Sequence, residues 1–309
     1  MSQIDAPPLP KLPLGEAISL SYAWFFQKFA DVLRISWLWL VLCGVVIGAL
    51  NWVQWSWMAA AIAEAAKSHG QGGRPHIMPP SGFGSLSTLT YLIMTIGTAS
   101  IGVAWHRRII LEEQPGLSGG NIVTSALWRY VGIGIVLGVI CLLPTVIFVV
   151  PFIFVVGPTV QGAMGQQPNG TAILAIFLIV FVCFIVALAI MLRLSVLLPA
   201  RAVGDTALSF RQAWSRTRGN IWRMFWGLVA CCLPPLIALE IVSAIVMAAI
   251  GFPKAMPADG QFAVPALGMT IMGTLMFLLS LLIVPIYIGF LSHSYRHFFQ
   301  GGIDVDELI

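Results

Sequence analysis

Six uninterrupted apolar stretches, each long enough to cross a bilayer, dominate this sequence of 309 residues. Only 9% of the residues are charged, whereas a soluble domain needs roughly 25% to cover its surface. A helix crosses the hydrocarbon core with about 20 residues, and continuously apolar runs favour helices over a transmembrane barrel. We therefore predict an all-α integral membrane protein with six transmembrane helices. The predicted spans are Ile35–Ala63, Leu86–Ala104, Val131–Val156, Ala172–Leu192, Phe225–Ile250 and Ala266–Leu291.

Little sequence remains outside these spans. Residues 1–13 are rich in proline and lack the apolar core of a secretory signal, so we expect a disordered tail there. Residues 14–300 are predicted to form a single six-span membrane domain, followed by a C-terminal tail at 301–309. The cysteines all fall within predicted spans, and no motif for phosphate binding, zinc binding or nucleophilic catalysis is evident. We expect no cofactor and no metal site.

The basic residues predict the orientation. Thirteen of the sixteen lysines and arginines fall on one side of the six-span arrangement, and the positive-inside rule assigns that side, with both termini, to the cytoplasm. A basic face attracts anionic lipid headgroups, at about 1 kcal/mol per residue, so the net charge of +4 needs no nucleic-acid partner. The thirteen are Lys11, Lys28, Arg34, Arg107, Arg108, Arg129, Arg193, Arg201, Arg211, Arg216, Arg218, Arg223 and Arg296.

A repeated plan joins the spans. An apolar residue followed by tryptophan occurs in three connectors, at Ala23–Trp24, Leu127–Trp128 and Ala213–Trp214, and each connector leads into a span. We predict three units, about 14–115, 116–205 and 206–300, each with an interfacial amphipathic helix and two spans. The alternative is that any six-span protein with amphipathic connectors shows such a pattern.

The connector at residues 209–221 has the best-defined amphipathic pattern. On a helix, Phe210, Ala213, Trp214, Thr217 and Ile221 share one arc, and the arginines Arg211, Arg216 and Arg218 share the other. This pattern is typical of a helix in the membrane interface, and the arginines are candidate lipid-headgroup ligands. A similar stripe of Leu14, Ile18, Tyr22, Phe25, Phe29 and Leu33 precedes the first span.

Small residues and prolines occur within the spans. The pairs Gly44/Gly48 and Gly134/Gly138 are four residues apart, a spacing that lets helices approach closely, either within the chain or between subunits of an oligomer. Interior prolines such as Pro144, Pro234 and Pro285 predict bends. These bends either surround a cavity or reflect the general frequency of proline in membrane helices.

Few polar side chains fall at membrane depth. Glu240 is the one carboxylate within a predicted span, and Asn51 and Gln54 lie at a comparable depth in the first span. An ionisable group there is a candidate functional site, because its burial is costly unless it is paired. The alternative is that Glu240 lies close enough to the outer interface for water or a basic residue to satisfy it.

A second polar group follows the second span. His106, Arg107 and Arg108 lead to Glu112 and Glu113, and on a helix Arg108 and Glu112 can pair. A histidine with carboxylates and arginines at the interface could bind a lipid headgroup or a metal. The favoured alternative is a satisfied interfacial cluster that ends a helix.

Three elements carry a resemblance to a known group. They are Trp105-His106-Arg107, Arg193-x-Ser195 with Leu198-Pro199-Ala200, and Ala213-Trp214 with Thr217-Arg218-Gly219-Asn220-x-Trp222-Arg223. Together they resemble uncharacterised bacterial, largely alphaproteobacterial, inner-membrane proteins, which are similar to the six-helix membrane domain of some glycerophosphodiester phosphodiesterases. The resemblance implies the architecture and a bacterial inner-membrane location. The soluble segments here are too short for the catalytic barrel of those enzymes, so it implies no activity.

Three functions are compatible with these residues. The leading prediction is a multipass inner-membrane protein without a catalytic site, acting as a scaffold or a lipid-interacting component in envelope homeostasis. An alternative is a small transporter or channel-like protein that uses Glu240 and bent helices. A second alternative is a lipid-headgroup enzyme that uses His106, Glu112 and Glu113. Anionic lipids are the expected partners, and the sequence identifies no protein partner.

Overall fold

The structure is a computed structural model that describes residues 11–68, 83–114, 124–161, 170–250 and 266–301. These residues are helical, without strands, and six of the helices are long and apolar enough to cross a membrane. The prediction of an all-α, six-span membrane protein is confirmed. The six are α2 (Phe29–Ser68), α3 (Phe83–Ile110), α4 (Ser125–Gln161), α5 (Gly170–Leu194), α8 (Ile221–Ile250) and α9 (Ala266–Phe299).

The helices extend beyond the predicted spans. The 40 residues of α2 form a rod of about 60 Å, roughly twice the thickness of the hydrocarbon core. Hydropathy detects only the apolar part of such a helix. Its polar ends continue into the interface because the backbone hydrogen bonds of a helix do not stop where the lipid does.

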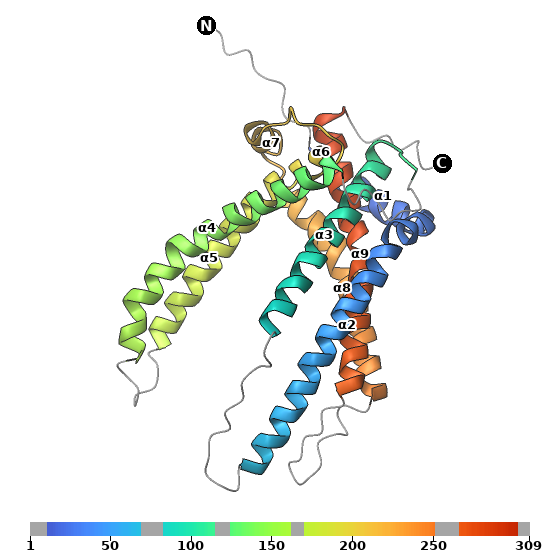
Figure 1. Cartoon of the computed structure of the whole chain (residues 1–309). Coiled ribbons are helices and arrows are strands. Elements are labelled where there is room, and N and C mark those ends of the chain that lie inside the picture. Colours follow the sequence, from blue (N-terminus) through green and yellow to red (C-terminus); the bar gives the residue numbers. More distant parts are fainter. Residues whose placement is uncertain (1–10, 69–82, 115–123, 162–169, 251–265, 302–309) are drawn as a thin grey trace.

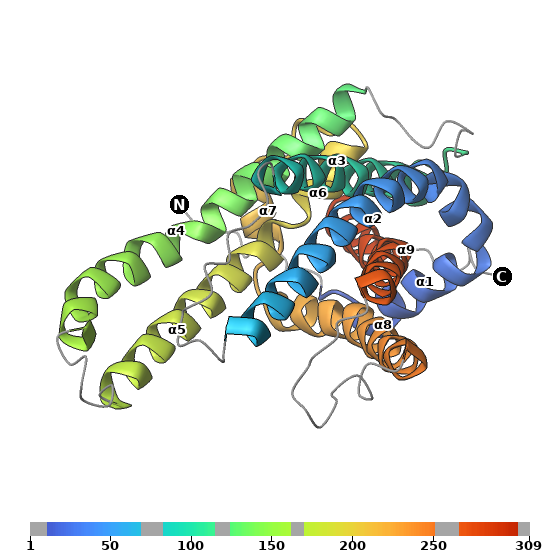
Figure 2. The same cartoon turned by 60° about the horizontal axis from the view of Figure 1, so that its bottom comes forward.

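The last helix, α9, is the centre of the bundle. It packs against α1 (Leu14–Gln27), α2, α3 and α8, as the two views in Figures 1 and 2 show. Small residues permit this close packing, as in other membrane bundles. At Gly289, a Cβ would lie 3.4 Å from the Cα of Ser21 in α1. At Gly227 of α8, a Cβ would lie only 2.0 Å from the ring of Phe290 in α9.

The α4–α5 hairpin leans away from the rest of the bundle (Figures 1 and 2). Its two helices pack against each other, and they join the other helices through α6 (Leu197–Ala202), α7 (Phe210–Arg216) and the adjoining helix ends. The exposed apolar side chains of α5 lie between Leu174 and Val186, in the part of the helix farther from the basic end. In a bilayer these exposed side chains contact lipid.

The short helices α1, α6 and α7 all lie at one end of the bundle (Figure 1). The thirteen basic residues that the sequence groups together belong to these helices, to the adjoining ends of the long helices and to their connections. We call this end the basic end. Five acidic residues, Glu16, Asp31, Glu112, Glu113 and Asp205, accompany them in the described part of the chain. Among the described residues, basic side chains therefore outnumber acidic ones at the basic end by thirteen to five.

The N-terminal segment at the basic end is more ordered than the sequence suggests. Residues 11–13 belong to the predicted disordered tail, yet Leu12 is fully buried. Its N–H donates to Oδ1 of Asn220 at 2.9 Å, and its carbonyl accepts from Arg223 at 2.6 Å. The ordered chain thus begins before the predicted boundary, and residues 1–10 lie outside the described residues.

The predicted units differ in their entry helices. A separate short helix precedes the first span of the first and third units, namely α1 and α7. In the second unit Leu127 and Trp128 lie in the first turn of α4 itself, and residues 115–123 lie outside the described residues. The stripe predicted across residues 14–33 is divided at Lys28, where α1 ends and α2 follows. The threefold repeat remains a prediction.

The two glycine pairs have different environments. A Cβ at Gly44 would lie 3.5 Å from Leu278, and one at Gly48 would lie 3.7 Å from Thr274, so this pair packs α2 against α9 within the chain. A Cβ at Gly134 or Gly138 would meet nothing within 4 Å among the described residues. An oligomer through the second pair remains a prediction.

Candidate functional site

The polar residues at membrane depth do not gather into one site. Asn51 lies between α2 and α9, where its Nδ2 donates to Oγ1 of Thr274 at 3.3 Å. The missing side chain of Gly273 makes room for this amide, because a Cβ there would lie 3.0 Å from Nδ2. Gln54 is half-buried, whereas Glu240 is exposed on α8. Asn51 thus joins two helices, and Glu240 faces away from the packed interior.

His106 is fully buried between α3, α4 and α9. Its Nδ1 lies 2.7 Å from Oγ of Ser292, and its ring centroid lies 5.7 Å from that of Tyr130. Oγ of Ser292 also lies 2.9 Å from the Ile288 carbonyl oxygen, to which its hydroxyl can donate. Nε2 of His106 has no partner among the described residues.

The carboxylates that follow α3 do not share this environment. Glu112 and Glu113 are both exposed, whereas His106 is fully buried. The structure therefore does not bring together the three residues of the predicted lipid-headgroup enzyme. Among the described residues, no group of three or more His, Cys, Asp and Glu side chains could hold a metal ion.

The arginines after His106 connect helices at the basic end. The expected pairing of Arg108 with the Glu112 carboxylate is wrong, because α3 ends at Ile110 and Glu112 has a φ of 55°. Arg108 instead pairs with Asp31 of α2, with Nε and Oδ2 2.9 Å apart, and donates to the backbone carbonyl of Glu112 at 3.3 Å. Arg107 pairs with Glu113. Both cations are therefore neutralised within the protein.

The remaining headgroup candidates lie on and just after α7. A capping box begins this helix: the N–H of Gln212 donates to Oγ of Ser209 at 3.3 Å, and the N–H of Ser209 donates to Oε1 of Gln212 at 2.8 Å. The side chains of Arg211, Arg216 and Arg218 are exposed. In the described part of the chain, no carboxylate pairs with any of the three.

Arg193, at the end of α5, holds α7 in place. Its guanidinium carbon lies 3.6 Å from the ring centroid of Trp214, a cation–π contact, and the side chain also donates to the Trp214 carbonyl. Thr217, which ends α7, is fully buried and donates to the Ala213 carbonyl at 2.8 Å. The Thr217 hydroxyl also lies 3.4 Å from the Arg193 carbonyl oxygen, so Arg193 contacts the residue that precedes Arg218. Among the described residues, no carboxylate pairs with either arginine.

An apolar groove of about 420 Å³ lies beside these arginines, between α5 and the start of α8. We call it the α5–α8 groove. Leu188 and Leu192 line it from α5, and Trp222 and Phe225 line it from α8. Trp222 is 73% exposed and packs edge to face on Phe225, with ring centroids 5.9 Å apart. The arrangement combines unneutralised positive charge with an adjacent apolar surface.

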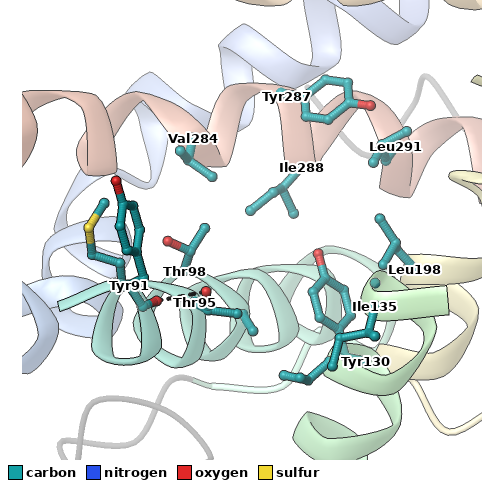
Figure 3. Close-up of a pocket in the computed structure, with 14 residues that line it drawn as sticks. Tyr91, Thr95, Thr98, Tyr130, Ile135, Leu198, Val284, Tyr287, Ile288 and Leu291 are labelled. Carbon is teal, nitrogen blue, oxygen red and sulfur yellow. Dashed lines mark hydrogen bonds between the residues drawn. The ribbon is translucent and has the colours of Figure 1, made fainter. Parts of the chain in front are cut away.

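A second groove, of about 580 Å³, lies between α3, α4 and α9. We call it the α3–α9 groove, and Figure 3 shows its lining. Three tyrosines and two threonines contribute hydroxyl groups to walls that are otherwise apolar. They are Tyr91, Thr95, Thr98, Tyr130 and Tyr287.

The α3–α9 groove was not predicted from the sequence, although the sequence of α3 contains a signal for it. Tyr91, Thr95, Thr98, Gly102 and His106 are spaced by four, three, four and four residues, which places them on one face of α3. A polar face on an otherwise apolar span predicts contact with something other than lipid tails. Which helices complete the groove depends on the tertiary arrangement.

The comparisons with known proteins give no relative. No family model matches the chain, and neither the search of curated proteins nor the search of solved structures finds a match.

Proposed function

We propose that this multipass membrane protein binds anionic phospholipid at its basic end, without a catalytic role. The observation that carries the proposal is the set of unpaired arginines on and just after α7, the last of which, Arg218, directly precedes Gly219 in the lining of the α5–α8 groove. We further propose a bacterial inner-membrane location with both termini in the cytoplasm, which makes the basic end the cytoplasmic end. The lipid-interacting reading of the sequence is thereby tied to particular residues.

Charge supports this proposal. Arg211, Arg216 and Arg218 are exposed, and Arg193 contacts Thr217, the residue before Arg218. Guanidinium groups bind phosphate oxygens through paired hydrogen bonds, and they are more weakly hydrated than lysine amines. An anionic headgroup therefore relieves the repulsion between neighbouring arginines, which a zwitterionic headgroup does less well because it carries its own cation.

The apolar surroundings support the same proposal. An acyl chain of the bound lipid would lie in the α5–α8 groove, against Leu188, Leu192 and Phe225. Trp222 and Trp214 stand where tryptophan is enriched in membrane proteins, at the boundary between headgroups and acyl chains. In the proposed three-unit arrangement, α7 is the interfacial helix of the third unit and α1 that of the first.

Native mass spectrometry after extraction into detergent tests the proposal. Wild-type protein incubated with phosphatidylglycerol should retain more lipid than with phosphatidylcholine. Replacing Arg211, Arg216 and Arg218 by glutamine should weaken phosphatidylglycerol retention on the order of tenfold to a hundredfold, since each basic residue contributes about 1 kcal/mol and salt screens part of it.

A matched control separates a site from net charge. Replacing Lys28, Arg34 and Arg129 by glutamine removes the same charge from exposed residues at the basic end, none of which lines the α5–α8 groove or adjoins a residue that does. This control should retain phosphatidylglycerol nearly as wild type does. Equal loss in both triple variants would show that only nonspecific charge attracts the lipid and would refute the proposed site.

A further inference from the structure

The α3–α9 groove opens to the outside of the bundle at membrane depth. Its lining residues belong to three membrane-spanning helices and to α6. Tyr91 is 70% exposed and Ile135 is 59% exposed, so the rim of the groove is not covered by another described part of the chain. At this depth the surrounding medium is lipid rather than water.

The lining is uncharged. Apolar side chains such as Val284, Ile288 and Leu291 form the α9 wall, and the polar groups of the lining side chains are hydroxyls. A charged headgroup in this groove would lose its hydration without meeting a counter-charge among the lining residues, which is costly in a low-dielectric environment. The chemistry therefore selects a lipid whose polar part is neutral.

Two hydroxyls are available to hold that polar part. In Figure 3 the hydroxyl groups of Tyr91 and Tyr130 both point across the groove toward α9. Among the described residues neither hydroxyl has a hydrogen-bond partner. A hydroxyl without a partner in the hydrocarbon region is costly, and a ligand carbonyl would satisfy it.

The Tyr130 end of the groove is the more polar one. The Tyr130 hydroxyl lies against Gly102, where a Cβ would be 2.9 Å from its oxygen. Behind it, buried His106 carries the unpartnered Nε2. Tyr130 also follows directly on Arg129, at the start of α4 and near the basic end. From Gly102 to Tyr91 is eleven residues of α3, about 16 Å, over which an acyl chain can lie along the helix.

From these observations we propose that the α3–α9 groove binds a neutral glycerolipid of the diacylglycerol type. Its ester carbonyl accepts a hydrogen bond from Tyr130, and an acyl chain lies between α3 and α9 toward Tyr91. This site is separate from the arginine cluster on α7, and it neither requires nor follows from anionic-lipid binding there.

Photo-crosslinking in nanodiscs of phosphatidylcholine tests this inference, with a diacylglycerol that carries a photoreactive group on one acyl chain. Wild-type protein should be labelled saturably on the stretches 91–98 and 284–291, and unlabelled diacylglycerol should compete. Unlabelled phosphatidylglycerol should compete at least about tenfold less well, because the charged headgroup is not neutralised in the groove. Equal competition by the two lipids would overturn the assignment to a neutral ligand.

Two glycines of α4 provide a matched pair of variants. Gly134 lines the α3–α9 groove, whereas Gly132 lies about 200° away around the helix and does not line it. Both glycines are exposed, and a Cβ on either would meet no other described atom within 4 Å. Gly134→Leu should fill the groove and reduce labelling at least about tenfold, and Gly132→Leu should leave it unchanged. Equal labelling of the two variants would overturn the proposal.

A conservative variant tests the hydrogen bond separately. Tyr130→Phe keeps the ring against Gly102 and removes only the hydroxyl, so it should weaken competition by unlabelled diacylglycerol about fivefold while the protein remains monodisperse. Unchanged competition in Tyr130→Phe would remove Tyr130 as the ligand-binding donor.

Discussion

Replacing Gly227 by alanine should strongly disturb the contact between α8 and α9. A Cβ at this position would lie 2.0, 2.3 and 2.8 Å from three ring carbons of Phe290, whereas carbon atoms pack at about 3.5–4.0 Å. Phe290 is 1% exposed, so its ring has no open space into which to turn. Either the ring leaves its rotamer or the two helices separate.

The expected magnitude follows from two opposing effects. Overpacking a core costs about 1–3 kcal/mol, and an overlap this deep belongs at the upper end of that range. Alanine is favoured over glycine in a helix by about 1 kcal/mol. We therefore expect Gly227→Ala to lower the free energy of unfolding by about 2 kcal/mol.

Thermal unfolding in detergent, followed by tryptophan fluorescence, measures this change. Gly138→Ala is the matched control, since its Cβ would meet nothing within 4 Å, and it should be as stable as wild type or slightly more stable. Adding Phe290→Leu to Gly227→Ala should recover part of the loss, because the smaller side chain removes the overlap. If Gly227→Ala is as stable as Gly138→Ala, the described packing of α8 on α9 is incorrect.

Three further changes test other parts of the structure. Asp31→Asn should lower the free energy of unfolding by about 1–3 kcal/mol, because it leaves the mostly buried Arg108 unpaired. Glu113→Gln, at the more exposed pair with Arg107, should lower it by less than about 1 kcal/mol in the same thermal assay. Asn220→Ala leaves the buried N–H of Leu12 without its acceptor, so limited proteolysis should cut the N-terminal segment several times faster, and an unchanged rate would contradict the described contact. Glu240→Gln, at an exposed site, should change the free energy of unfolding by less than about 0.5 kcal/mol and leave phosphatidylglycerol retention intact. Loss of a measurable solute flux in this variant would instead support the transporter alternative.

Hydropathy was sufficient to predict the class of this protein. A span in lipid must satisfy its own backbone hydrogen bonds, so a long apolar run has few alternatives to a helix, and the six runs correspond to α2, α3, α4, α5, α8 and α9. The helix ends were less predictable. Asp31 and Arg34 belong to α2 although both are charged, because one of them has a partner on α3 and the other is exposed.

Side-chain pattern was less informative where helices pack closely. Of the stripe predicted for the first connector, Phe25 is among the buried residues of α1, but the others that are buried, Ala17, Leu20 and Ser21, lie outside the stripe. Ser21 lies against Gly289, so this face is selected by small size rather than by hydropathy. Amphipathic patterns identify an apolar face, but a small-residue contact between helices leaves almost no hydropathy signal.

The candidate sites were likewise predictable where they depend on a local sequence pattern and not where they depend on tertiary contacts. The exposed arginines of α7 were identifiable from the sequence, because a cluster of like charges beside tryptophans is a local pattern. The roles of Arg107 and Arg108 were not, because their partners depend on where α3 ends and on which helix lies beside it. The α3–α9 groove brings together residues nearly two hundred positions apart, and that pairing of helices is set by tertiary packing.

The central claim, that anionic lipid is held at the α7 arginines beside the α5–α8 groove, is tested most directly by mapping where a photoreactive phosphatidylglycerol attaches. Our account predicts saturable labelling concentrated on residues 185–192 and 219–225, which line that groove, and its loss when Arg211, Arg216 and Arg218 are replaced by glutamine. Labelling spread over all lipid-exposed helices, unchanged in the triple variant, would contradict it.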